Sequence, residues 1–192
     1  MMDDRTYRIL KWTAIAFGVL WFAYEGYQHF AVREPGDMAY LTANNFFKDR
    51  YYKRAEETYR DALKEAPEHQ PAIRGLANTL TQLKRHEEAL AVINNAVKLD
   101  PKFAGNYANR GIILDHLGRH KDAISDYELS LGMDNDVAKG MHWLDRLLYN
   151  IQEIPPTVAD RLAYLKKQMT LPESERVLRK PDLDDKQRPY EQ

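Results

Sequence analysis

A repeat of 34 residues is the feature that most restricts how this 192-residue chain can fold. Shifting the sequence by that length superposes three segments without a gap, namely residues 36–69, 70–103 and 104–137. A period of this kind is typical of a helical hairpin that cannot bury its apolar stripe alone and is stabilised by stacking on its neighbours. The sequence therefore predicts an all-α solenoid of three stacked hairpins.

The residues that recur at equivalent positions indicate how the hairpins pack. Small residues recur where two helices must approach closely, large apolar residues recur one turn later, and a second set recurs in the following helix. These positions are Ala43, Ala77 and Gly111; Phe46, Leu80 and Leu114; Ala55, Ala89 and Ala123; Tyr59, Ile93 and Tyr127; and Ala62, Ala96 and Ser130. Pro67 and Pro101 end two of the second helices. We expect helices near 38–48, 52–65, 70–83, 86–98, 104–117 and 120–132.

This pattern resembles the tetratricopeptide repeat (TPR) family over residues 36–137, a little over half of the chain. The resemblance implies a protein-binding solenoid in which the first helix of each repeat lines a concave groove. No glycine-rich phosphate loop or nucleophile in a recognisable setting occurs in the sequence, so we expect no enzymatic activity.

Beyond the third repeat, residues 138–170 are predicted to form a degenerate fourth repeat or pair of capping helices. Apolar periodicity predicts helices over 138–151 and 157–169, with Pro155 and Pro156 between them. Residues 171–192 contain three prolines, mixed charge and little apolar content. We expect this tail to be extended along a partner or disordered.

Residues 1–35 are predicted to hold a single transmembrane helix that anchors the repeats. An uncharged run covers residues 13–24, Lys11 flanks it, and aromatic residues lie towards both ends, as at membrane interfaces. The residues assigned to the anchor are Trp12, Phe17, Leu20, Trp21, Phe22 and Tyr24. A cleaved signal peptide and an amphipathic helix packed on the repeats are the alternatives.

Basic residues flank the apolar run unequally. Arg5, Arg8 and Lys11 precede it, whereas only Arg33 follows closely. The positive-inside rule then places the amino terminus in the cytoplasm and the repeats on the periplasmic or equivalent side.

Charge and composition exclude several classes of site. The formal net charge is −1, which gives no basic face for nucleic acid. The chain has no cysteine, so disulfides and thiolate metal sites are absent. His116 and His120 are four residues apart, but Gly118 lies between them at a predicted turn, and we interpret them as solvated. No metal, cofactor or small-molecule substrate is expected.

The resemblance places a peptide groove on the exposed face of the first helices. The residues assigned to it are Asn44, Phe47, Lys48, Arg74, Asn78, Thr81, Gln82, Ile112, Asp115, His116, His142, Arg146, Tyr149 and Asn150. Some family members clamp the terminal carboxylate of heat-shock chaperones with Lys, Asn and Arg. Asn44 matches that clamp, but Tyr40, Gly75, Gly105 and Asn109 stand where Lys, Asn, Lys and Arg are expected. We therefore expect no chaperone-tail clamp.

The anchor and the repeats together suggest a non-catalytic, membrane-anchored scaffold or accessory subunit of a membrane complex. Its expected partners are other protein subunits or peptide segments, with lipid contacted by the first helix. The alternative is a transient assembly chaperone or targeting factor that binds client peptides in the groove.

Overall fold

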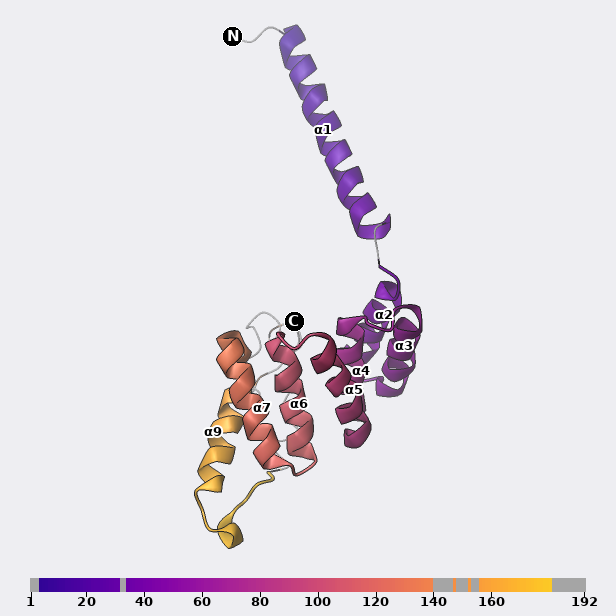
Figure 1. The fold of residues 1–192 in the computed structure, drawn as a ribbon. Helices are drawn as coiled ribbons and strands as arrows, with labels where there is room; N and C mark the ends of the chain where they lie inside the picture. The colour runs from indigo at the N-terminus through magenta and orange to yellow at the C-terminus, as the bar shows by residue number, and fades with distance from the viewer. Residues whose placement is uncertain (1–3, 32–33, 140–146, 148–151, 153–155, 181–192) are drawn as a thin grey trace.

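The computed structural model describes residues 4–31, 34–139, 147, 152 and 156–180. Helix α1 (Asp4–Ala31) extends away from a stack of antiparallel hairpins (Figure 1). The hairpins pair α2 (Asp37–Lys48) with α3 (Tyr52–Glu65), α4 (Gln70–Gln82) with α5 (His86–Leu99), and α6 (Ala104–His116) with α7 (His120–Met133). The 3-10 turn η1 (Asn135–Ala138), helix α9 (Val158–Met169) and the 3-10 turn η2 (Glu173–Glu175) follow, and α9 packs against α7.

The six helices predicted for the repeats agree with α2 to α7 to within one residue at each end. The predicted last helix over 157–169 corresponds to α9, which begins at Val158 after a capping box formed by Thr157 and Asp160. Most of the predicted helix over 138–151 lies outside the described residues, and residue 138 itself belongs to η1.

One backbone position closes the turn of every hairpin. Arg50, Lys84 and Gly118 lie 34 residues apart and adopt left-handed φ angles of 63°, 61° and 75°. In each turn, the amide of the next residue donates to the carbonyl five residues earlier at 2.8 to 2.9 Å. This pattern is the Schellman motif, which satisfies the last carbonyls of a helix. The repeat in sequence is therefore also a repeat of turn geometry.

The recurring small residues are sites of close helix approach. Ala43 and Ala77 are fully buried, and a Cβ added to Gly111 would lie 2.6 Å from the Tyr127 ring. The rings of Tyr59 and Tyr127 are buried at equivalent positions of the first and third repeats. At Gly111 the small residue thus allows the close approach of α6 and α7 that was predicted at these positions.

The transmembrane anchor predicted for residues 1–35 is wrong. Within the described residues, no helix is both long and apolar enough to cross a membrane. Helix α1 has 28 residues, but its uncharged run covers only residues 12–24 and is bracketed by Lys11 and Glu25. A span needs about 20 predominantly apolar residues. The predicted single-pass localisation, its orientation and the lipid contact all depended on this segment and are corrected with it.

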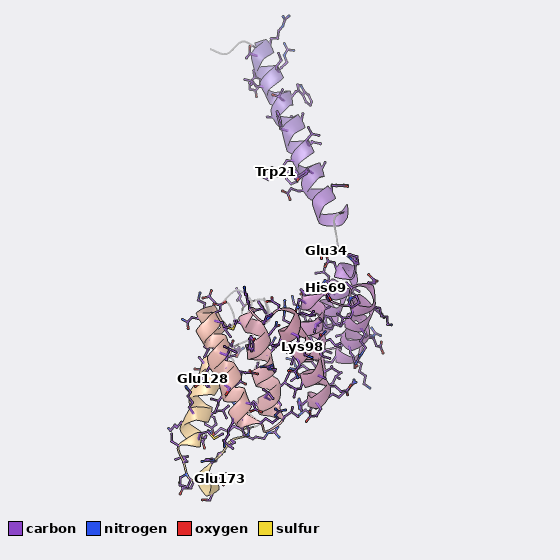
Figure 2. The ribbon with its side chains drawn as sticks, viewed as in Figure 1. Trp21, Glu34, His69, Lys98, Glu128 and Glu173 are labelled. Atoms are coloured by element: carbon purple, nitrogen blue, oxygen red, sulfur yellow. The ribbon has the colours of Figure 1, made fainter. Side chains whose placement is uncertain are left out.

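The side chains assigned to the anchor lie exposed along α1, and Figure 2 shows Trp21 on this projecting helix. The exposed residues are Trp12, Phe17, Leu20, Trp21, Phe22 and Tyr24. The Trp21 indole donates to Glu25 Oε1 at 3.0 Å, one turn further along. Polar partners therefore occur within the segment that we had predicted to lie in lipid.

Candidate peptide-binding groove

The first helices of the three hairpins lie side by side. α2 contacts α4, and α4 contacts α6, while each also packs against the second helix of its own hairpin (Figure 1). Side chains on the free faces of α2, α4 and α6 therefore form one continuous surface. This is the surface on which the groove was predicted.

A small depression lies between α4 and α6 on this surface. It combines amide, hydroxyl, imidazole and aliphatic side chains. The lining residues are Asn78, Thr81, Gln82, Asn109, Ile112, Ile113 and His116. Five of them, all except Asn109 and Ile113, were assigned to the groove from sequence. The structure thus brings together predicted residues that lie more than 30 positions apart in the chain.

The lining of the depression is uncharged apart from His116, and its polar groups are mainly amides. The Thr81 hydroxyl already donates to the Ala77 carbonyl at 2.9 Å, which leaves the amides of Asn78 and Gln82 as the polar groups of α4. An amide presents both a donor and an acceptor, as a peptide backbone does. Ile112 adds an apolar contact on the α6 side.

Asn44, the one residue that matches the chaperone clamp, is hydrogen-bonded within the protein. The Tyr59 hydroxyl donates to Asn44 Oδ1. Gly75 lies directly over the Tyr59 ring, so that a side chain at this position would collide with the ring. The tyrosine therefore fills the space in which a clamp side chain at residue 75 would stand.

Three other predicted groove residues are placed away from the depression. The Phe47 ring packs edge-on against Tyr52 at 5.6 Å and is half-buried beside the core, and Lys48 is exposed at the end of α2. The Arg74 guanidinium lies 4.4 Å from the centre of the Phe103 ring. Burial lowers the pKa of Arg74 below its usual value, with partial compensation from Tyr40 and Asp100.

Asp115 was predicted to face the groove, but the structure buries it in an ion-pair network. Arg161 donates to its two carboxylate oxygens at 2.5 and 3.0 Å, and His120 Nδ1 lies 2.8 Å from Oδ1. Asp115 and Arg161 each have side chains only 6% exposed. Asp115 therefore holds α9 against α6 and is not available to a ligand.

Two histidines border the depression. The rings of His86, at the start of α5, and His116, at the end of α6, are stacked with centres 4.9 Å apart and planes 4° apart. Burial lowers the pKa of His86, and positive charge at His116, Arg179 and Lys84 lowers it further. The prediction of solvated histidines is wrong for His120, which is buried against Asp115.

Other parts of the predicted site lie beyond what the structure describes. His142, Arg146, Tyr149 and Asn150 belong to residues 140–146 and 148–151, which lie outside the described part of the chain. Among the residues that are described, no group of three or more His, Asp or Glu side chains could hold a metal ion.

Sequence reasoning missed Asn109 and Ile113 as lining residues. The 34-residue spacing places Asn109 at the position of Gly75, so a comparison of equivalent positions in α4 and α6 carried the signal for Asn109. The stacking of His86 on His116 could not be predicted from the repeat, because the two histidines occupy different positions within their repeats.

Family models described as tetratricopeptide repeat match residues 47–109 and 104–137. Residues 47–137 of this chain are therefore tetratricopeptide repeats. The TPR fold is a protein-interaction fold, and the two matches together extend from the end of α2 to η1.

Two curated proteins show what the TPR chain is similar to. Hsp70-Hsp90 organizing protein 2 of Arabidopsis thaliana is 26% identical over 152 residues, which are 76% of this chain and 26% of that protein. Small glutamine-rich tetratricopeptide repeat-containing protein 2 of Mycosarcoma maydis is 29% identical over 98 residues, which are 50% of this chain and 28% of that protein. The chain thus spans about a quarter of the length of these relatives.

Solved structures share the fold. The first TPR of Spaghetti (RPAP3), bound to the HSP90 peptide SRMEEVD, has a TM-score of 0.58 and 18% identity, and the match covers 71% of this chain and 94% of that one. The TPR2B domain of yeast Sti1, in a complex with pHsp70, has a TM-score of 0.56 and 21% identity, with 70% and 98% covered. At this identity the likeness shows the fold alone.

Proposed function

We propose that this chain is a non-catalytic TPR adaptor that captures an extended peptide segment of a client protein, as a transient assembly chaperone or targeting factor does. The observation that carries the proposal is the convergence of five predicted groove residues in one depression between α4 and α6. TPR structures of the same fold include peptide complexes, which supports this use of the surface. The alternative of a scaffold in a membrane complex depended on the transmembrane anchor, which the structure does not support.

The proposed ligand is an internal, largely uncharged segment rather than an acidic carboxyl terminus. A terminal carboxylate needs fixed cations, and Tyr40, Gly75, Gly105 and Asn109 supply none at the positions where the family resemblance places the clamp. Asn44 is engaged by Tyr59. The groove instead offers the amides of Asn78 and Gln82, which suit the donor and acceptor groups of a peptide backbone.

A peptide array probed with the full chain tests this proposal. We expect peptides that bind the wild type to bind Gln82→Arg at least about tenfold more weakly, because the longer side chain fills the depression. Asn95→Arg adds the same side chain on the exposed face of α5 and is the matched control, which should leave affinity unchanged. Equal losses in the two variants, or no loss in Gln82→Arg, would rule out this depression as the binding site.

The peptide SRMEEVD tests the proposed ligand chemistry separately. We expect the free acid and the carboxyl-amidated peptide to bind with equal, weak affinity in fluorescence anisotropy, because no clamp cations contact the terminus. A free acid that binds at least about tenfold more tightly than its amide would show that a carboxylate clamp exists here.

A further inference from the structure

Residues 176–180, here called the strap, lie extended along α9 after the turn at η2. The Tyr164 hydroxyl donates to the Val177 carbonyl at 2.6 Å, and Arg161 Nη2 donates to the Leu178 carbonyl at 2.9 Å. The Val177 amide donates to Gln168 Oε1 at 2.8 Å. Residues 161, 164 and 168 share one face of a helix. That face of α9 therefore contacts the backbone of an extended segment at successive points.

Side chains of the strap also make contacts, and the Arg176 guanidinium donates to the Leu171 carbonyl at 2.9 Å. Leu178 is half-buried and packs against the core, whereas its neighbour Val177 is 51% exposed. The Lys180 ammonium lies 4.7 Å from the centre of the Tyr164 ring, within the range of a cation–π interaction. The segment is thus held by its backbone, by the Leu178 side chain and by the cations Arg176 and Lys180.

The surface beneath the strap is fixed independently of it. Arg161 is held by Asp115 through two charge-assisted hydrogen bonds, and Asp115 also contacts His120. A guanidinium fixed in this way loses little side-chain entropy when it binds a carbonyl. The α9 face would therefore stay formed if the strap left.

The α9 face does not overlap the depression, because Arg161, Tyr164 and Gln168 are not part of its lining.

We propose that the α9 face formed by Arg161, Tyr164 and Gln168 is a second peptide site, and that the strap is its displaceable occupant. The strap fills the site in the resting chain. Once released, the site accepts an extended segment with the strap's pattern, an aliphatic residue followed by two basic ones. This proposal does not depend on the groove function, because the two sites share no lining residue.

A labelled peptide with the sequence of residues 174–180 provides the probe. We expect the full-length Leu178→Asp variant to bind it at least about tenfold more tightly than the wild type in fluorescence anisotropy, because a carboxylate cannot replace the half-buried leucine in its apolar contact and the strap leaves the site. Val177→Asp introduces the same charge at an exposed neighbour and should behave as the wild type does. Adding Tyr164→Phe to Leu178→Asp should weaken peptide binding again.

Equal peptide affinity of the wild type, Val177→Asp and Leu178→Asp would overturn the proposal. So would a Leu178→Asp variant whose affinity is unchanged by Tyr164→Phe. Circular dichroism establishes that each variant keeps its helical content. If Leu178→Asp does not, Leu178→Ala removes the anchor without adding charge and is expected to give the same order of affinities.

Discussion

At the scale of single residues, the left-handed turn position is the most direct place to test the repeat. Lys84 and Gly118 occupy the same position with φ angles of 61° and 75°. A side chain in this region is disfavoured by contact between Cβ and the backbone, whereas glycine adopts it freely. Glycine at position 84 should therefore raise the stability of the chain, and a side chain at position 118 should lower it.

We predict that Lys84→Gly stabilises the chain by about 0.5–1 kcal/mol and that Gly118→Ala destabilises it by about 1 kcal/mol. Urea unfolding followed by circular dichroism measures both free energies. The same sign of change for the two substitutions would contradict a shared left-handed turn.

His86 makes stability depend on pH. Its pKa in the folded chain is lowered from 6.5 by burial and by positive charge at His116, Arg179 and Lys84. Below about pH 6.5 the unfolded chain therefore binds more protons at this residue than the folded chain does. The stability that His86 supports is complete above that pH and is lost as the pH falls through the lowered pKa.

We predict that the melting temperature of the wild type falls more steeply between about pH 7 and about pH 5 than that of His86→Gln. Glutamine keeps polar atoms at this position but cannot take up the charge. Parallel melting curves across this range would show that the stacked histidines do not contribute to the pH dependence.

At the scale of helices, glycine has two different roles within one hairpin. Gly111 in α6 faces the buried Tyr127 ring, and an added Cβ would come within 2.6 Å of it. Gly132 in α7 has open space around the same added atom. Substituting Gly111 by alanine therefore tests close packing, whereas substituting Gly132 tests helix propensity alone.

We predict that Gly111→Ala destabilises the chain by about 1–3 kcal/mol through overpacking. Gly132→Ala should stabilise it by about 0.5–1 kcal/mol, because alanine favours helix and meets nothing at this position. Thermal or urea unfolding compares the two variants. A Gly111→Ala variant as stable as Gly132→Ala would mean that the α6–α7 contact is looser than the structure shows.

The helices of the repeats were predictable because their bounds follow from local signals. Prolines end the second helices of the first two repeats, and small and large apolar residues recur every 34 positions. Asp115 was misassigned because its partner Arg161 lies 46 residues away, outside the period, so nothing local marked it as buried. The tail has low apolar content, and residues 176–180 are held mainly by hydrogen bonds of their backbone to α9 side chains, with Leu178 as the apolar contact.

At the scale of the whole molecule, α9 joins the last hairpin to the strap. Lys166 pairs with Glu128 of α7 at 2.6 Å, and Arg161 pairs with Asp115 of α6 (Figure 2 labels Glu128). The Arg161–Asp115 pair is buried. Removing one partner of a buried pair strongly destabilises a protein, because the other charge is left unpaired. The far end of the stack is therefore held by specific charges as well as by apolar contacts.

The central claim is that the face formed by α2, α4 and α6 binds an extended peptide. Hydrogen exchange of the full chain, with and without a saturating peptide chosen on the array, tests it most directly. We predict slower exchange in α4 and α6 around Gln82 and His116, with α5 and α7 away from these residues unchanged. Protection confined to α1, or to the outer helices α5 and α7, would contradict the claim.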